Sequence, residues 1–360
     1  MSTEERILLV RLSHLGDVVH ALPVFHALRQ RHPEARIAWA VEPEFAGLLE
    51  GLPGLECTIR FGRREGAAAW LRLASKLASF SPTWVVDAQG NLKSAAVSLC
   101  APSARRSGLH PRDWRERAGA RVLHDWAQAA AHEPAHAIDR MLALARHVGK
   151  QDATACFDLG LSREEREQGS EALEAALGGP AQRDVVLLAL SGPSDVRSWP
   201  LLHWAELARS LSRAGKRVLV VSGPGEAAAG LQLARELAAD TGVRSWIGQR
   251  GLRVYAAALS AAAAAGMRYV GVDSGPLHLA AACGLSVVAL EGPQSHARTG
   301  PWPPPERAER FQFETARHAI VRSAETLACA PCYSRICAHR EGPVCMSRLT
   351  PGLVIAALAC

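Results

Sequence analysis

The residues most able to do chemistry stand in short polar loops that follow apolar, strand-like runs. The first loop, in "RLSHLGDVV", carries four of them: Ser13, His14, Gly16 and Asp17. A carboxylate in such a loop can accept a proton from a substrate hydroxyl. The same acid can instead simply stabilise the positive end of the helix that follows it. The loop alone leaves both roles open for Asp17.

A second loop, in "VVDAQGNLKSA", follows another short apolar run. It places Gln89, Asn91 and Lys93 just after Asp87 and beside an expected helix start. Polar groups in such a place can bind the hydroxyls or the phosphate of a substrate. The alternative is an ordinary helix with a cap, and with Lys93 exposed to solvent.

The second half of the chain holds two more loops of this kind. Arg197 lies in "ALSGPSDVRSWP", where a cation after a strand suits a diphosphate. A surface arginine stacked on Trp199 is the other interpretation. Glu226, in "VSGPGEAAA", can reach a ribose hydroxyl in a nucleotide-binding domain, or it can merely favour a helix start.

The fifth loop, in "YVGVDSGPLHLAAACG", gives the sharpest signal. Asp273, Ser274 and Gly275 lie between a strand-like run and a helix that has Pro276 in its first turn. Such a helix start presents backbone N–H groups and the helix dipole to an anion. His278 falls on about the same helix face as Ser274. The alternative is a capped helix with a histidine satisfied inside the protein.

Alternating strands and helices must position these loops. Expected strands span residues 7–12, 36–41, 84–86, 185–190, 217–221, 269–272 and 287–290. Expected helices span residues 18–31, 91–99, 136–150, 203–214, 226–239, 252–265, 276–283 and 351–360. This alternation predicts βαβ units. The expected protein is therefore α/β, with two Rossmann-like domains whose parallel sheets face each other across a cleft.

Length and composition indicate a globular protein with more than one core. The chain has 360 residues, of which 48% are hydrophobic and 21% charged. Apolar runs stay shorter than the roughly 18 residues of a membrane span, and the N-terminus lacks a signal-peptide pattern. These features predict a cytosolic protein. A charged helix and a Gly-Pro connector at 161–182 mark the expected domain boundary.

The net charge of +6 is modest, but arginine is concentrated at 29–36, 60–66 and 103–121. Arginine suits phosphates and carboxylates, so these clusters fit an anionic substrate or a membrane surface, or else a solvated face. Aromatic residues do not interleave with them, so nucleic acid is not an expected partner. The first strand is not followed by G-x-G-x-x-G, which disfavours a nicotinamide-dependent dehydrogenase.

Four of the nine cysteines are clustered in "CAPCYSRICAHREGPVC", namely Cys329, Cys332, Cys337 and Cys345. In a cytosolic protein this clustering favours metal over disulfides. A structural zinc ion with four thiolate ligands is the expected occupant, and an iron–sulfur cluster is a weaker one. Reduced thiols or redox disulfides remain the alternative.

Together the loops resemble those of glycosyltransferase family 9, the ADP-heptose:lipopolysaccharide heptosyltransferases. The matching stretches span nearly the whole chain in family order: "RLSHLGDVVHALPVFHALR", "VVDAQGNLKSA", "SARRSG", "RSWP", "SGPGE", "GVDSGPLHLAAACG" and "EGP". The resemblance implies a GT-B fold and an inverting transfer that needs no metal ion for catalysis. It implies an acceptor domain at 1–165, a linker at 166–182 and a nucleotide-sugar domain at 183–328. Residues 329–360 would carry the cysteines and a last helix that packs back on the N-terminal domain.

The resemblance also assigns roles in the first domain. Asp17 matches the family's proposed base, which takes the proton of the acceptor hydroxyl. The acceptor is then expected against the polar residues of the two N-terminal loops, namely Ser13, His14, Gly16, Gln89, Asn91 and Lys93. The expected acceptor is an anionic lipopolysaccharide precursor, glycosylated on a Kdo or heptose residue. The enzyme would lie in the cytoplasm, peripherally at the inner face of the cytoplasmic membrane.

In the second domain the resemblance implies a site for ADP-heptose or a related nucleotide-sugar. Arg197 stands where well-known members carry a lysine that contacts the diphosphate, and Glu226 matches a glutamate associated with the adenosine ribose. The family motif that binds donor phosphates and sugar is matched by Asp273, Ser274, Gly275 and His278. Residues 192–193 replace two threonines of some members, so Ser191 or Ser194 is expected to take over that contact.

The family does not fix the sugar or the acceptor. A transferase of the same fold with another nucleotide-sugar or acceptor is therefore an alternative to heptosyl transfer. A protein of this fold that transfers nothing, such as a sugar-nucleotide epimerase or a binding subunit, is the other.

Overall fold

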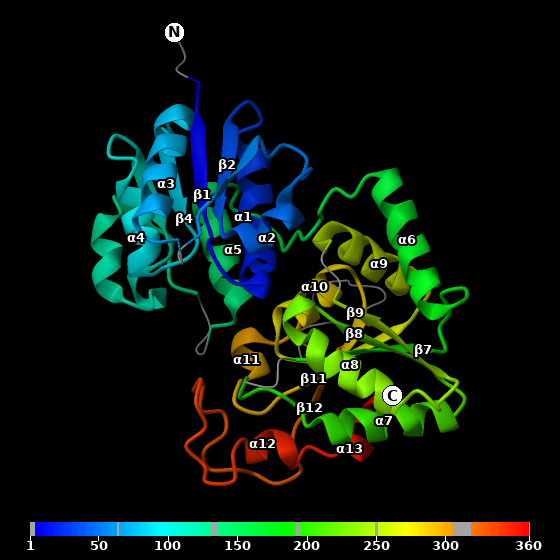
Figure 1. Ribbon diagram of the computed structural model, residues 1–360. Helices are drawn as coiled ribbons and strands as arrows, with labels where there is room; N and C mark the ends of the chain where they lie inside the picture. The colour runs from blue at the N-terminus through cyan, green and yellow to red at the C-terminus, as the bar shows by residue number, and fades with distance from the viewer. Residues whose placement is uncertain are drawn as a thin grey trace. The chain divides into compact units, whose positions relative to one another are not determined.

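The computed structural model describes residues 4–62, 65–130, 135–191, 195–248, 251–304 and 318–359. The chain divides into two compact units, Met1–Leu161 and Ser162–Cys360. Each unit is built on its own six-stranded sheet, in which every pairing of neighbouring strands is parallel (Figure 1). The α/β class expected from the sequence is confirmed.

The sheet of the first unit has the strand order β3-β2-β1-β4-β5-β6. Its strands are β1 (Arg6–Val10), β2 (Arg36–Val41), β3 (Cys57–Arg60), β4 (Trp84–Asp87), β5 (Arg105–Gly108) and β6 (Asp125–Trp126). The central strand β1 lies between β2 and β4, with Leu8 opposite Ala38 and Val85. Residues 7–10 are completely buried, as expected for a strand covered on both faces.

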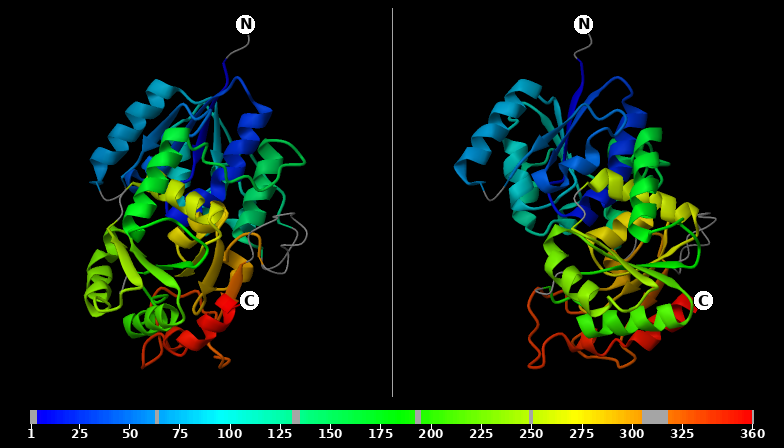
Figure 2. Two further views of the ribbon diagram at one scale, coloured as in Figure 1. Left: turned by 90° about the vertical axis from the view of Figure 1, so that its right-hand side faces the viewer. Right: turned by 45° about the vertical axis from the view of Figure 1, so that its right-hand side comes forward.

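Helices cover both faces of this sheet (Figure 2). They are α1 (Leu15–Arg31), α2 (Pro43–Leu49), α3 (Ala67–Phe80), α4 (Leu92–Leu99) and α5 (Ala137–Val148). The apolar stripe of α3 packs with Leu8 and Val10 on one face. Because side chains alternate along a strand, Ile7 and Leu9 point to the other face. Helix α1 also packs against α5.

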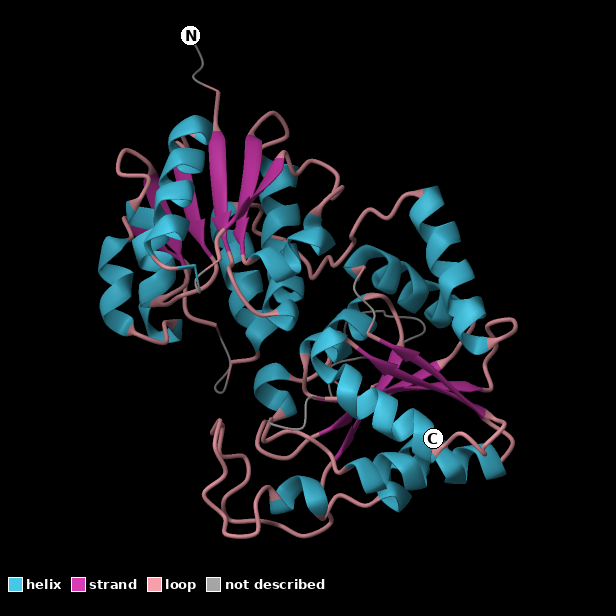
Figure 3. Ribbon diagram, in the orientation of Figure 1, coloured by secondary structure: helices cyan, strands magenta, loops and turns pink. Residues whose placement is uncertain are grey.

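The sheet of the second unit has the order β12-β11-β10-β7-β8-β9. Its strands are β7 (Val185–Ala189), β8 (Arg217–Ser222), β9 (Val243–Ile247), β10 (Arg268–Val272), β11 (Ser286–Leu290) and β12 (Ala319–Val321). Its helices are α6 (Arg163–Leu177), α7 (Leu201–Arg213), α8 (Ala227–Glu236), α9 (Leu252–Ala264), α10 (Gly275–Ala282), α11 (His296–Thr299), α12 (Val344–Ser347) and α13 (Pro351–Ala359). Figure 3 shows these helices and strands by type. No helix in the described parts of either unit has the length and apolarity that crossing a bilayer requires.

The two sheets share one topology. Within each unit the first strand lies between the second and the fourth, so that the order of strands reverses beside β1 and beside β7. Open parallel sheets bind ligands at such a switch point, outside the carboxyl ends of the strands. The loops after β1 and β4, and those after β7 and β10, are the loops that the sequence singled out.

One boundary differs from expectation. The predicted linker at 166–182 contains most of α6, a helix that packs against α9 and belongs to the second unit. Gly169 allows this packing, because a Cβ there would lie 2.6 Å from the backbone nitrogen of Ala258. The last helix, α13, contacts α7 and the sheet of the second unit, and its Val354 is part of that core.

An ion pair fastens α6 to α9. Arg253 Nη2 donates to Glu165 Oε2 at 2.8 Å, and Nε of Arg253 donates to Oε1. The hydrogen bonds from Arg253 lower the pKa of Glu165 from 4.5 to about 2, against an opposing effect of burial. Because the folded pKa is depressed, this stabilisation is complete above pH 4.5 and is lost as the pH falls towards 2.

We expect Glu165→Gln to lower the melting temperature of the second unit by about 1–3 °C at pH 7, since a partly exposed ion pair contributes up to about 1 kcal/mol. Glutamine can still cap the helix, so the charge alone is removed. The difference from the unsubstituted protein should shrink as the pH falls below 4.5. Differential scanning calorimetry measures both effects. In the control Glu167→Gln, the lost partner Arg163 lies exposed on the same helix, so little change is expected. Equal melting temperatures for Glu165→Gln and the unsubstituted protein at pH 7 would contradict the prediction.

Candidate functional site

Asp17 lies in the first turn of α1, directly after the loop that follows β1. Its side chain is 36% exposed and forms an ion pair with Arg11, at 2.5 Å between Oδ1 and Nη2. The other oxygen, Oδ2, lies 3.4 Å from the backbone nitrogen of His14. Asp17 is therefore a first-turn acid, yet its carboxylate is also held by a cation and partly open to solvent. The structure thus shows the first-turn position, and the role of Asp17 as a base stays a prediction.

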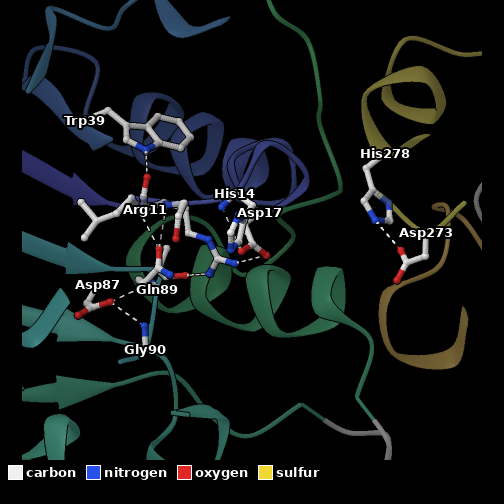
Figure 4. Close-up of polar contacts among 12 residues, drawn as sticks. Arg11, His14, Asp17, Trp39, Asp87, Gln89, Gly90, Asp273 and His278 are labelled. Atoms are coloured by element: carbon white, nitrogen blue, oxygen red, sulfur yellow. Dashed lines mark hydrogen bonds and ion pairs between the residues drawn. The ribbon is translucent and has the colours of Figure 1, made fainter. Parts of the chain in front are cut away.

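Arg11 connects the first loop to the second (Figure 4). The residue is buried, and its Nη1 donates to the carbonyl oxygen of Ala88, the first residue after β4. Gln89 makes a second connection, because its Oε1 accepts a hydrogen bond of 2.9 Å from the backbone nitrogen of Leu12. Side-chain hydrogen bonds thus connect the loop after β1 to the loop after β4. Gln89 was a ligand-binding candidate from the sequence, and in the structure its side-chain carbonyl oxygen binds the backbone of the first loop.

The buried carboxyl of Asp87 shapes the second loop. Its Oδ1 accepts hydrogen bonds from the backbone nitrogens of Gln89 and Gly90, at 2.8 and 2.9 Å. Burial raises the pKa of Asp87, while the bonds from Gly90, Ser94 and Gln89 oppose that rise. Gly90 has a φ of +71°, a conformation that favours glycine. The buried carboxyl of Asp87 therefore holds the turn that follows β4 in its conformation.

The other first-unit candidates have structural partners of their own. Asn91 caps α4, accepting a hydrogen bond of 2.9 Å from the Ser94 nitrogen, which is the alternative that the sequence offered. Lys93 Nζ lies 3.7 Å from a carboxylate oxygen of Glu42. Ser13 is buried and His14 is exposed at the N-cap of α1.

In the second unit, Asp273 is the first residue after β10 and is buried. Its two carboxylate oxygens bind different partners: Oδ1 lies 3.0 Å from His278 Nε2, and Oδ2 accepts a hydrogen bond of 3.0 Å from Thr299. Figure 4 shows the histidine turned towards this carboxylate. Asp273 therefore orients the His278 ring, which stands one turn into α10. A direct contact of this carboxylate with a phosphate would also be repulsive.

Arg197 fastens the loop after β7 to the loop after β10. Its Nη1 donates to the carbonyl oxygen of Asp273 at 2.6 Å, and its Nε donates to Asp195 Oδ1 at 2.9 Å. Burial alone would raise the pKa of Asp195, but the hydrogen bonds from Arg197 outweigh it and keep that pKa below its usual range. Trp199, the alternative partner of Arg197, is turned into the core and donates to the carbonyl of Leu349 at 2.7 Å.

The remaining donor candidates lie around these loops. Ser274 is the N-cap of α10, and Gly275 begins that helix, so their backbone groups stand at its positive end. Ser191 Oγ is buried and has no hydrogen-bond partner within the described parts of the chain. Glu226 stands just before α8, with its carboxylate beside Gly223. Ser194 lies outside the described residues.

The four clustered cysteines line a single pocket of the second unit: Cys329, Cys332, Cys337 and Cys345. They are free thiols in the structure. In the described ranges, no three His, Cys, Asp or Glu side chains gather closely enough to hold a metal ion. The thiols are thus brought to one place without converging on a common centre.

Three residues that hold these loops were not among the candidates predicted from the sequence: Arg11, Asp195 and Thr299. Arg11 stood within the quoted first loop, and Asp195 lies two residues before Arg197. A charged residue directly after a buried strand was the available signal for Arg11. No local signal pointed to Thr299, because it is 26 residues from the aspartate to which it donates.

Comparisons with known proteins identify the family and the fold of this chain. The family model described as Glycosyltransferase family 9 (heptosyltransferase) matches residues 70–326. Lipopolysaccharide heptosyltransferase 1 of Pseudomonas aeruginosa is 28% identical over 370 aligned positions, covering 96% of this chain and 95% of that protein. The crystal structure of a family 9 glycosyltransferase from Veillonella parvula superposes with a TM-score of 0.77 at 18% identity, over 100% of this chain and 98% of that one.

A second solved structure, Escherichia coli heptosyltransferase WaaC with ADP, gives a TM-score of 0.70 at 21% identity and covers 98% of this chain and 99% of its own. The structural likenesses establish the fold, and the family model covers well over half of the chain. The protein therefore belongs to glycosyltransferase family 9 and is a glycosyltransferase with the fold of the solved heptosyltransferases.

Proposed function

We propose that the protein transfers a heptose from ADP-L-glycero-D-manno-heptose to a Kdo or heptose hydroxyl of the lipopolysaccharide inner core, with inversion. The observation that carries the proposal is the partly exposed carboxylate of Asp17, held by Arg11 at the switch point of the first sheet. The name of the Pseudomonas aeruginosa relative supports the class of acceptor. A related solved structure is described as WaaC with ADP-2-deoxy-2-fluoro heptose, which supports the donor.

Asp17 serves as the general base of the transfer. Arg11 fixes one carboxylate oxygen, and Oδ2 remains to take a proton from the acceptor hydroxyl. As that proton leaves, the acceptor oxygen bonds to the anomeric carbon and the bond from this carbon to the ADP oxygen breaks. One displacement from the opposite face inverts the configuration without a covalent enzyme intermediate. The rigid connection of Arg11 to Ala88 keeps the base in place.

The second unit binds the donor and stabilises the leaving diphosphate. The N-terminus of α10 supplies backbone N–H groups from Gly275 onwards. Arg197 has five N–H donors, of which Asp195 and Asp273 use three within the described part of the chain, and the proposal assigns the other two to phosphate oxygens. The proposal assigns Glu226 to the ribose and Ser191 to a phosphate, and it is supported by the absence of a hydrogen-bond partner for Ser191 Oγ among the described residues. A helix end and a guanidinium supply the positive charge, so the proposal needs no metal ion for transfer.

The surface of the first unit suits an anionic lipid acceptor. Five arginines are exposed between α4 and β6: Arg105, Arg112, Arg115, Arg117 and Arg121. Large apolar side chains are exposed in the same region, with Leu92 at 54%, Leu99 at 53% and Trp126 at 47%. Exposed basic and apolar groups of this kind favour binding to an anionic membrane surface. The proposal therefore places the enzyme peripherally at the inner face of the cytoplasmic membrane.

The decisive experiment offers ADP-heptose to the purified protein together with Kdo₂-lipid A or with a heptosylated acceptor. We expect transfer of one heptose to one of these acceptors, detected by mass spectrometry, and an anomeric configuration opposite to that of the donor. Transfer from another nucleotide-sugar, or to another acceptor, would replace the proposed substrates while keeping the enzyme class. Epimerisation of the sugar without transfer would overturn the proposal.

We expect Asp17→Asn to lower kcat by about 10²–10⁴-fold, because the proton acceptor is lost. The affinity for ADP-heptose, measured by calorimetry, should remain within about twofold because no donor group changes. The matched control is Glu44→Gln, which removes another exposed acid from a first helical turn of the same unit. Normal turnover by Asp17→Asn would show that Asp17 is only a helix-stabilising acid.

Arg197→Ala should weaken ADP binding by about 10- to 100-fold, since charge-assisted hydrogen bonds contribute about 1.5–3 kcal/mol. Isothermal titration with ADP measures this directly and needs no acceptor. Arg197→Lys should recover part of the affinity, because it restores the charge without the planar fork. Arg213→Ala, at an exposed arginine of the same unit, is the control. An unchanged ADP affinity in Arg197→Ala would remove the diphosphate role.

A further inference from the structure

Helix α11 (His296–Thr299) has only four residues, and its side chains contact the segments that follow β10 and β11 (Figure 1). Thr299 Oγ1 donates to Asp273 Oδ2 at 3.0 Å, and His296 Nδ1 lies 3.2 Å from Oε2 of Glu291. A single helical turn is not stable through its own backbone hydrogen bonds. Contacts of its side chains therefore keep α11 in place.

Glu291 anchors α11 to the sheet. It is the first residue after β11, and its side chain is 1% exposed. Arg322 donates to Oε2 of Glu291 from Nε at 3.1 Å and from Nη2 at 2.8 Å. Because Val272 of β10 is paired with Leu290 of β11, Asp273 and Glu291 are the next residues on two adjacent strands. The register of the sheet therefore sets the position of α11 relative to Asp273.

The buried carboxylate of Asp273 is held at both oxygens. His278 Nε2 lies 3.0 Å from Oδ1, and Thr299 donates to Oδ2. The last torsion of an aspartate side chain has broad minima, so its carboxylate turns readily. The contact with His278 alone would thus leave the plane of the carboxylate, and with it the imidazole, free to turn. Within the described parts of the second unit, Thr299 is the one residue that donates to Oδ2.

Asp273 also acts on Arg197. The hydrogen bonds to Asp195 raise the pKa of Arg197 most, and the charges of Asp195 and Asp273 raise it further, against an opposing effect of burial. The backbone carbonyl of Asp273 accepts a hydrogen bond of 2.6 Å from Arg197 Nη1. A change in the orientation of the Asp273 carboxylate would therefore affect both the imidazole of His278 and the charge that faces Arg197.

We propose that Thr299 is a positioning residue of the donor site, whose hydroxyl fixes the carboxylate of Asp273 and thereby orients His278. This inference rests on the proposed function, in which the second unit binds the nucleotide-sugar. Thr299 acts through Asp273 and needs no contact of its own with the substrate. Its hydroxyl is the group that matters, because Oδ2 accepts from an O–H donor and a methyl group supplies none.

The first test separates the hydroxyl of Thr299 from its methyl group. Thr299→Val keeps the shape and leaves Oδ2 of the buried Asp273 without its donor, so we expect the affinity for ADP to fall about tenfold in isothermal titration calorimetry. Thr299→Ala should behave in the same way. Thr299→Ser keeps the hydroxyl and should stay within about twofold of the unsubstituted protein.

Thr241→Val, at an exposed threonine of the same unit, is the matched control and should bind ADP normally. Unchanged affinity in Thr299→Val would overturn the proposal. A loss in the serine variant alone would overturn it too, because the methyl group would then be the part that acts.

Nuclear magnetic resonance gives a readout that needs no ligand. In protein carrying isotope-labelled histidine, the ring nitrogen signals of His278, assigned with His278→Gln, report on the contact with Asp273. These signals should shift in Thr299→Val and Thr299→Ala, and should keep their positions in Thr299→Ser and Thr241→Val. Circular dichroism identifies the variants that are folded. Unshifted His278 signals in the folded valine or alanine variant would overturn the proposal.

A double-mutant cycle tests whether Thr299 acts through Asp273. Thr299→Val should lower the affinity for ADP about tenfold in the unsubstituted protein and less than about twofold in Asp273→Ala, because the effects of coupled residues do not add. Equal losses in the two backgrounds would overturn the action through Asp273.

The same variants separate this inference from the proposed function. ADP binding that depends on the Thr299 hydroxyl, in a protein that transfers no heptose, would overturn the proposed function and leave the positioning role standing. Normal ADP binding and normal heptosyl transfer by Thr299→Val would overturn the positioning role and leave the proposed function standing.

Discussion

The functional loops of both sheets depend on the bonds of an arginine that follows the first strand. In the first unit, Arg11 binds the carbonyl of Ala88 and the carboxylate of Asp17. A buried guanidinium fills the switch point and satisfies a backbone carbonyl that the end of β4 leaves without a strand partner. The loop that carries the proposed base therefore cannot move without breaking a charge-assisted bond.

The second unit repeats the arrangement with different residues. Arg197 binds the carbonyl of Asp273, again the first residue after the fourth strand, and pairs with Asp195 on its own loop. Both sheets share one strand order, so the same geometric need arises twice. In the first unit the arginine binds a partly exposed carboxylate, and in the second it binds a carboxylate and a backbone carbonyl. This difference underlies the proposal of proton transfer at the first site and phosphate binding at the second.

Most elements of the two sheets were predictable because their apolar runs are strong. Residues 7–12, for example, were expected as a strand, and β1 is found at Arg6–Val10. The weaker elements were missed. Helix α3 was overlooked although its buried residues Ala69, Leu73, Leu77 and Phe80 recur at helical spacing. Strand β9 consists largely of partly exposed residues that become a strand only by pairing with β8. The helix of α6 was expected within 161–182, but its place in the second unit was not, because its apolar stripe is narrow and its partner is a distant helix.

The sequence by itself determined the α/β class, the family and the loops that carry chemistry, because strand runs, helix periodicity and motif spacing are local properties. Only the tertiary structure decided what each side chain in those loops does. Asn91 caps a helix, Asp273 orients His278, and Asp17 is held by Arg11. These outcomes depend on which chain segments lie side by side in a sheet. A hydrogen bond between residues 76 or 77 positions apart leaves no mark on local sequence, so its partners emerge only when the strands are paired.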